Sequence, residues 1–236
     1  MGRLHFLMAL RHMKKDLLSS NPKRILEAGT KQGHLAFWLA RSYGCQVVGL
    51  DLNQTQVAEN ERLARQLDLK NLSFLQADLT KPLPSVEKFD LILCLHVLEH
   101  IAADDLALKS LFEATADNGR LIILVPGGLE TIPDFSPEQL ALLDHVRPGY
   151  TLVELSQKVA AAGYEISWSG PAVGLWGTWA GQIDFHLCLS SKQFIWNSLG
   201  TALSTILVFL EYYFPIRPKY DVLLVAWKRP AWAVSG

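Results

Sequence analysis

Apolar and polar positions alternate between two periods from residue 24 onward. Short, almost continuously apolar runs, typical of parallel strands covered on both faces, occupy Arg24–Ala28, Gln46–Leu50, Leu72–Gln76, Phe89–Leu95 and Arg120–Val125. Helix-like stretches lie between most of them, over His34–Tyr43, Gln54–Leu67 and Val97–Ala116. This alternation predicts βαβ units in a doubly wound α/β sheet with helices on both faces.

The second half of the chain has a different texture. Pro126–Gly149 is rich in proline and glycine, which predicts loop with a short helix at Pro137–Asp144. Thr151, with Glu154 three residues later, is a capping-box pattern that predicts the start of a further helix. Gly163 is placed to end that helix.

Three more elements are predicted toward the end: a strand at Tyr164–Ser169, an apolar helix over about Gln193–Phe214 and a final strand at Tyr220–Trp227. The apolar helix contains several polar residues, and its uninterrupted apolar core, Ile206–Leu210, is far shorter than the roughly 20 residues of a membrane span. We expect a buried or interfacial helix. Peripheral membrane contact through 193–214 stays open as an alternative.

Composition narrows the class of protein. Half of the 236 residues are hydrophobic and 19% are charged, so the chain has enough apolar residues for a sizeable core. The net charge of −1 lacks the basic excess of a protein that holds nucleic acid through its phosphates. Cys45, Cys94 and Cys188 are widely spaced and form no CxxC pair, which predicts reduced thiols in a cytoplasmic protein.

The segment Ile25–Gly33 (ILEAGTKQG) runs from a strand through a glycine turn into a helix. Gly29 and Gly33 allow a sharp turn and a close approach to a ligand, and the following helix offers free N–H groups. The segment matches neither a Walker loop nor a full GxGxxG fingerprint. Taken alone, it is explained equally well as a packing turn between strand and helix.

Two acidic residues favour a ligand site. Asp51 ends the second strand, where a carboxylate can accept both hydroxyls of a ribose. Asp78 follows the third strand, where a carboxylate can accept from an adenine amino group. Each alone is a common loop cap. Together with Glu27, they place polar groups at the carboxyl ends of three strands, where open α/β sheets bind ligands.

An ordered set of segments resembles the class I S-adenosylmethionine-dependent methyltransferases: LEAGTKQG (26–33), VVGLDLN (47–53), LQADLTKPLP (75–84), FDLILCLHVLEHI (89–101) and NGRLIILVPGG (118–128). HVRPGYTLVEL (145–155) and AAGYEI (161–166) are similar to the small-molecule and quinone-type branch. The resemblance implies a Rossmann-like, seven-stranded sheet with six parallel strands. The last strand, Tyr220–Trp227, would lie antiparallel between the fifth and the sixth.

The resemblance also implies one domain and a cofactor site. The domain would consist of a leading helix (1–23), a cofactor-binding core (24–170), a substrate-side insert (171–219) and the final strand (220–228). Glu27, Gly29, Thr30 and Gly33 would surround the methionine part of S-adenosylmethionine. Asp51 would hold the ribose and Leu52, Asp78 and Leu79 the adenine, while Leu95 and His96 would line the methyl-donor side. Lys31 stands where many members have a third glycine.

The implied reaction moves a methyl group to a small, apolar or aromatic acceptor by O- or C-methylation and leaves S-adenosylhomocysteine. His96 and His145 are the candidate general bases, since histidine titrates near neutrality. His100 fits a packing or capping role better. A nicotinamide-dependent oxidoreductase and a non-catalytic methyltransferase-like binding module are the alternatives.

One motif competes with this interpretation. His96-Val-Leu-Glu-His100 has the H-x-x-E-H form of inverted zinc proteases. By that pattern both histidines would bind a metal from one helix face and Glu99 would act as base. The motif directly follows a buried strand, and no second ligand cluster is evident downstream. We therefore expect no metal.

Overall fold

The computed structural model describes residues 21–84, 87–128, 136–172, 203, 206–207, 209–210 and 221–230. Residues 1–20 of the leading helix expected over 1–23, and nearly all of the insert expected over 171–219, lie outside the described residues; the described residues 21–23 are not helical. Within the predicted helix Gln193–Phe214, the described residues are all helical. No helix among the described residues is long and apolar enough to cross a membrane.

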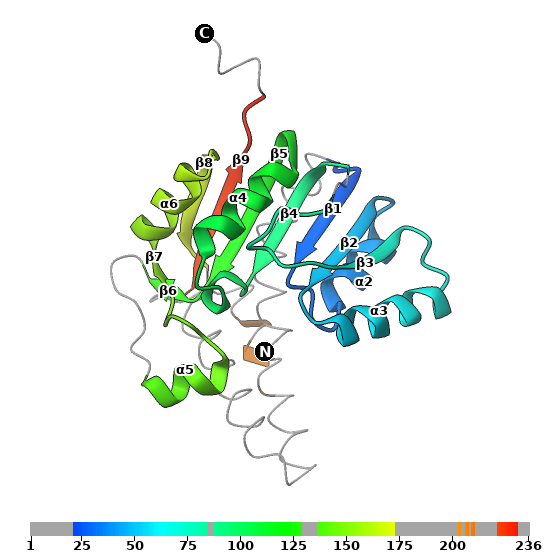
Figure 1. Ribbon diagram of the computed structural model, residues 1–236, viewed down its shortest axis with the longest axis horizontal. Coiled ribbons are helices and arrows are strands. Elements are labelled where there is room, and N and C mark those ends of the chain that lie inside the picture. Colours follow the sequence, from blue (N-terminus) through cyan, green and yellow to red (C-terminus); the bar gives the residue numbers. More distant parts are fainter. Residues whose placement is uncertain are drawn as a thin grey trace.

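A seven-stranded sheet forms the centre of the molecule, in the order β3-β2-β1-β4-β5-β9-β8 (Figure 1). Its strands are β1 (Arg24–Ala28), β2 (Gln46–Asp51), β3 (Leu72–Gln76), β4 (Phe89–Leu95), β5 (Thr115–Val125), β8 (Glu165–Pro171) and β9 (Val222–Trp227). The first five pair in parallel, whereas β9 lies antiparallel between β5 and β8. The predicted topology is therefore confirmed, including the position of the last strand.

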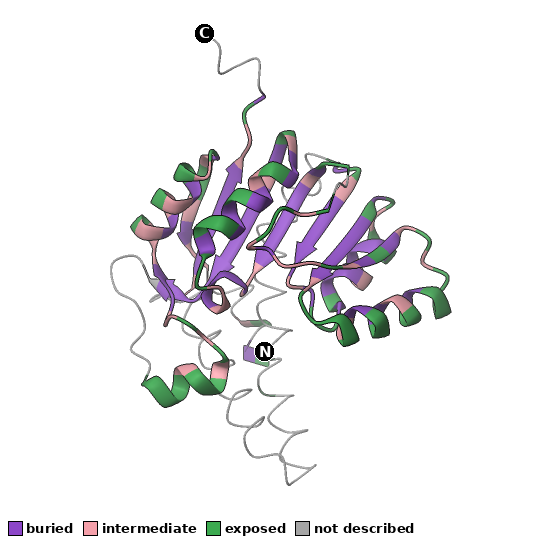
Figure 2. Cartoon of the chain, viewed as in Figure 1, coloured by how far each residue is buried: buried purple, intermediate pink, exposed green. Residues whose placement is uncertain are grey.

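Helices cover both faces of the sheet, as the apolar strands predict. The helices are α2 (His34–Ser42), α3 (Gln54–Gln66), α4 (Asp104–Ala114), α5 (Pro137–Leu143) and α6 (Leu152–Ala161). One core cluster joins α2 and α3 to the sheet, and a second joins α4 and α6 to its opposite face. The strands between these layers are buried almost throughout (Figure 2).

Small elements shape the carboxyl edge of the parallel strands. A 3-10 turn, η1 (Leu98–His100), follows β4, and a two-residue pair joins β6 (Gly127–Gly128) to β7 (Tyr150–Thr151). Helix α5 lies beyond this edge and has no buried residue. Its start at Ser136 carries a full capping box, and Thr151 accepts the Glu154 N–H at 3.1 Å to cap α6.

The prediction of one helix over Val97–Ala116 is wrong. His96 has a left-handed backbone (φ 53°), so the chain turns sharply after β4, and η1 is separated from α4 by Ile101–Ala103. Asp104 and Asp105 open α4, where acidic side chains interact favourably with the free N–H groups of the first turn. Thr115 and Ala116 belong to β5.

Candidate functional site

The glycine turn after β1 is held in one conformation by its neighbours. Gly29 and Gly33 both have φ 71°, a region that glycine adopts without strain. A Cβ on Gly29 would lie 2.5 Å from Val97 Cγ2, so the turn packs directly on the segment that follows β4. The Thr30 N–H donates to the Leu50 carbonyl at 2.9 Å, which ties the turn to β2.

Glu27 lies buried beneath this turn. Its Oε2 accepts the Thr30 hydroxyl at 2.6 Å and the Ala36 N–H, in the first turn of α2, at 3.0 Å. Burial raises the pKa of Glu27 to about 7, against the lowering effect of these two hydrogen bonds. The carboxyl group therefore holds a proton more tightly than a solvent-exposed glutamate does.

Asp51 ends β2 and anchors two loops at once. Its Oδ2 accepts the Lys31 N–H at 2.8 Å, and its Oδ1 accepts the Asn53 N–H at 2.9 Å. Asp51 thus has the loop-capping contacts. A carboxylate has about four acceptor positions, so two remain for a ligand.

Lys31 takes a left-handed conformation (φ 45°) where many relatives of this type would have glycine. Its carbonyl accepts the side-chain amide of the buried Asn60 at 2.7 Å. The sequence analysis missed Asn60. A signal was present, because Asn60 shares a helical face with Val57 and Ala64, both buried.

The adenine-side residues differ in exposure. Leu52 follows Asp51 with 67% of its surface exposed, whereas Leu79 is buried in the core. Asp78 Oδ1 accepts the Thr80 N–H and hydroxyl, and these bonds, with Lys81 at 3.3 Å from Oδ2, hold the pKa of Asp78 below its usual value. The structure therefore brings an exposed apolar side chain and an ionised carboxylate to the ends of neighbouring strands.

His96 sits between two carboxylates at the end of β4, next to the partly buried Leu95. Its Nδ1 lies 3.2 Å from Glu99 Oε1 and its Nε2 lies 3.4 Å from Asp221 Oδ2. Burial opposes the charged imidazolium, but Asp221 and Glu99 outweigh it and raise the pKa of His96 to about 10. A charged imidazolium has no lone pair to accept a proton, so this arrangement does not fit the predicted role of His96 as a general base.

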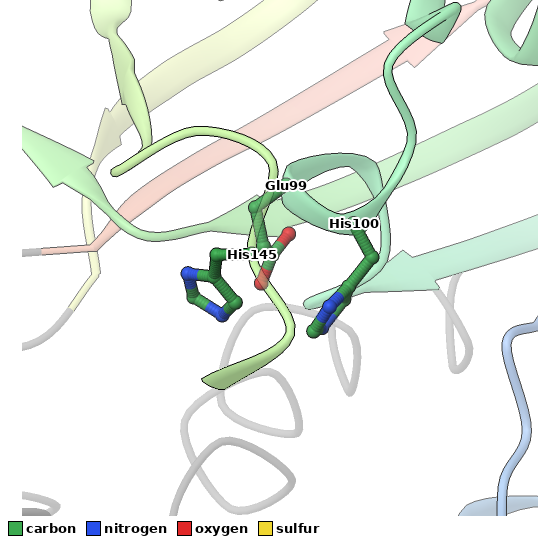
Figure 3. A group of neighbouring side chains, drawn as sticks. All are labelled: Glu99, His100 and His145. Carbon is green, nitrogen blue, oxygen red and sulfur yellow. The ribbon is translucent and has the colours of Figure 1, made fainter. Parts of the chain in front are cut away.

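His145 approaches the same region from the loop after α5. Its ring packs edge-on against His100, with 4.7 Å between the ring centroids. Burial lowers the pKa of His145, and the charges of His100 and His96 lower it further against the effect of Glu99. Figure 3 shows the Glu99 carboxylate next to both imidazoles. The role of His145 as a base stays a prediction.

The H-x-x-E-H motif does not form a protease-type metal site. His96 precedes the 3-10 turn and His100 ends it, so the two histidines do not share a helix face. His100 Nδ1 instead faces the Asp144 carbonyl at 2.7 Å, a contact compatible with the predicted packing or capping role.

Asp104, at the start of α4, connects this helix to α6 and to the loop that carries His145. It is 2% exposed, it accepts hydrogen bonds from the Tyr150 hydroxyl at 2.8 Å and from Lys158 Nζ at 3.0 Å, and it forms an ion pair with Arg147 Nη1 at 3.0 Å. No sequence pattern indicates this network, because its members lie far apart in the chain. It positions the loop that carries His145, two residues before Arg147.

The strand order and the ligand-facing carboxyl edge define a Rossmann-like methyltransferase fold. A family model described as "Methyltransferase domain" matches residues 19–166, more than half of the chain. The chain belongs to this methyltransferase domain family.

Two named methyltransferases are similar to this chain in sequence. The chain is 36% identical over 109 residues to demethylmenaquinone methyltransferase of Thermus thermophilus, covering 45% of this chain and 49% of that protein. It is 28% identical over 181 residues to the ubiquinone biosynthesis O-methyltransferase of Azorhizobium caulinodans, covering 70% of each. The chain spans half or less of the length of five of the curated relatives that it matches.

A solved structure shows the same fold at low identity. Coclaurine N-methyltransferase, bound to N-methylheliamine and S-adenosylhomocysteine, superposes with a TM-score of 0.63 at 17% identity. The superposition covers 94% of this chain and 72% of that one.

Proposed function

We propose that this protein transfers a methyl group from S-adenosylmethionine to a small, apolar or aromatic acceptor by O- or C-methylation. The family supports the reaction class. Two relatives, named for demethylmenaquinone and for ubiquinone biosynthesis, support an acceptor of quinone type. The buried free thiols of Cys45 and Cys94 support a reducing, cytoplasmic setting.

The acceptor groups and the exposed apolar side chain at the carboxyl edge fit S-adenosylmethionine. Asp51 offers two unused acceptor positions for a ribose diol, and the exposed Leu52 beside it offers an apolar surface for adenine. Asp78 is an ionised acceptor suited to the adenine amino group. Glu27, beside Gly29, Thr30 and Gly33, offers a carboxyl group to the ammonium group in the methionine part of the cofactor. This combination of a diol acceptor and a neighbouring exposed apolar side chain carries the proposal.

When bound, S-adenosylmethionine supplies an electrophilic methyl group on a sulfonium. The residues of this chain orient the donor and the acceptor in line and exclude water, which accounts for much of the rate gain in such transfers. Leu95 and His96 line the end of β4 on the methyl-donor side. The charged His96, held by Glu99 and Asp221, acts there as a positioning residue for the β4 turn.

Calorimetric titration with S-adenosylhomocysteine tests the ribose contact. Hydrogen bonds to a charged group contribute about 1.5–3 kcal/mol each, and 1.4 kcal/mol is about a tenfold change in affinity. Asp51→Ala should therefore weaken binding at least tenfold, and Asp51→Asn should fall between this variant and the wild type. Unchanged affinity in folded Asp51→Ala would exclude the assignment.

Asn60→Ala is the matched control, because it releases the same Lys31 turn while leaving the carboxylate in place. It should lower stability and keep the affinity within a few-fold of the wild type. An equal loss of affinity in both variants would mean that Asp51 acts only through the loop.

Two further measurements separate the alternatives. A ligand at 100 times its dissociation constant stabilises the folded state by about 2.7 kcal/mol, so thermal shifts with S-adenosylhomocysteine, NADH and NADPH rank the cofactors directly. Stabilisation by a nicotinamide alone would favour the oxidoreductase. Binding of S-adenosylmethionine without methyl transfer to any of a broad set of quinols, phenols and carbon acids would favour a binding module.

A further inference from the structure

Three groups that bind metals in other proteins meet beyond the end of β4. Glu99 and His100 come from η1, and His145 comes from the loop after α5. One ligand atom from each lies within 4.8 Å of the others. Figure 3 shows the Glu99 carboxylate beside the two imidazole rings, which contact each other edge-on with 4.7 Å between their centroids.

We propose that Glu99, His100 and His145 bind a divalent transition-metal ion of the zinc type. The site differs from the H-x-x-E-H pattern of the sequence, because His145 takes the place of His96. It also gives His145 a role other than that of a general base.

The donor set has the composition of an open zinc site. Two imidazoles and one carboxylate leave a fourth position of the tetrahedron for water or a ligand. With bonds of about 2.0–2.2 Å, neighbouring donors in such a site lie about 3.3 Å apart. The present cluster must therefore contract by at most about 1.5 Å along its longest edge, within reach of side-chain rotation at the partly exposed His100 and His145.

Hydrogen bonds already orient two of the three ligands. A carbonyl can only accept, so His100 Nδ1 carries the proton that faces Asp144 at 2.7 Å, and the lone pair is on Nε2. Glu99 Oε1 faces His96 Nδ1 at 3.2 Å, which leaves Oε2 for another partner. Metal-binding histidines and carboxylates are commonly fixed by second contacts of this kind.

The Glu99 carboxylate provides an independent indication. Its side chain is fully buried, and Oε2 has no hydrogen-bond partner among the residues that the structure describes. A buried acceptor without a partner is costly, and a bound cation next to it removes that cost.

The backbone holds the two segments together before any ion binds. The Val146 N–H donates to the Glu99 carbonyl at 2.9 Å, and the His145 N–H donates to the Leu140 carbonyl at 2.9 Å. The three ligands therefore come from segments whose relative position is set, which reduces the entropy lost on binding.

Titration of the chelator-treated full chain with zinc chloride tests the site, with no dependence on methyl transfer. We expect one zinc ion per chain, and cobalt(II) at the same site should show the visible absorption of tetrahedral coordination. His145→Ala should weaken zinc binding at least tenfold, and His100→Ala should do the same if the first variant does not fold. Circular dichroism checks the folding of each variant.

His34→Ala is the control, because His34 is an exposed histidine on α2 outside the cluster. It should bind zinc with unchanged affinity and stoichiometry. The proposal is overturned if the wild type binds no zinc, or if folded His145→Ala and His100→Ala bind it as tightly as the wild type does. A loss as large in His34→Ala would show adventitious surface binding and overturn it equally.

Discussion

At the carboxyl ends of β1 and β2, the carboxylates of Glu27 and Asp51 accept hydrogen bonds from backbone N–H groups. Beyond β4, by contrast, Glu99 and Asp104 face charged side chains. After the roles proposed above, we call these the cofactor half and the acceptor half of the edge, the latter for the methyl acceptor. Backbone donors cannot titrate or swing away, so the cofactor half is fixed by its local chain path. The acceptor half depends on side chains that arrive from distant segments.

The largest effect should come from breaking the network of the acceptor half at Asp104. Asp104→Ala leaves Lys158, Arg147 and the Tyr150 hydroxyl without their shared acceptor. Breaking a buried ion pair typically costs about 3–5 kcal/mol, and we expect a loss of this size in the free energy of unfolding, measured with urea.

Asp105→Ala is the matched control for this variant. Asp105 also contacts Lys158, at 2.9 Å, but its side chain is mostly exposed. Exposed pairs contribute about 0–1 kcal/mol. Similar losses in both variants would show that the burial of Asp104 does not matter.

The cofactor half should respond to pH through Glu27, whose pKa is raised from 4.5 to about 7 by burial. Glu27 holds its proton more tightly in the folded state than in the unfolded chain, so its protonation stabilises the folded state. This contribution is complete below pH 4.5 and is lost as the pH rises through 7. The difference amounts to about 3 kcal/mol at 1.36 kcal/mol per pKa unit. Urea unfolding of the wild type and of Glu27→Gln between pH 4.5 and 8 tests this. The gap, which is the difference in the free energy of unfolding between the two proteins, should change with pH. A gap independent of pH would contradict the raised pKa.

The glycine turn should be the next most sensitive point. Gly29→Ala combines a left-handed backbone, costing about 1–2 kcal/mol, with an overlap on Val97 that requires repacking. We expect a loss of about 2–3 kcal/mol in chemical denaturation. Gly44→Ala, where a Cβ meets nothing within 4 Å, should change stability little. Equal effects at the two positions would argue against the described turn.

The smallest effects should distinguish the helix caps of the two halves. Asn53 caps the packed helix α3, so Asn53→Ala should cost about 1 kcal/mol of global stability. Ser136 caps α5, which buries no residue. Ser136→Ala should therefore leave global unfolding unchanged and only speed amide exchange within α5. A global loss in Ser136→Ala would show that α5 is part of the cooperative unit.

The same division explains what the sequence could predict. The strands and the positions of Glu27, Gly29 and Asp51 at strand ends were predictable, because each follows from a local pattern of apolar residues, glycines and strand ends. The place of the last strand in the sheet came from the family resemblance. The break between η1 and α4 was not predictable, since the apolar spacing continues through it and the left-handed backbone at His96 leaves no mark in the sequence pattern.

The partners of the acceptor half were equally hidden. Asp221 meets His96, and Arg147 meets Asp104, across long stretches of chain. Such contacts depend on how distant segments pack, and no spacing within one segment indicates them. The sequence therefore placed His96 at the end of β4 but could not show the two carboxylates that raise its pKa.

The position of β9 between β5 and β8 has a consequence for biosynthesis. In this sheet β8 pairs with β9, so Glu165–Pro171 cannot join before Val222–Trp227 has left the ribosome. At about 5–20 residues per second, translation of the intervening segment takes several seconds. During this interval neither β5 nor β8 has β9 to pair with. A nascent chain of this protein thus passes through a stage with an unpaired, apolar strand edge, the type of surface that cellular chaperones protect.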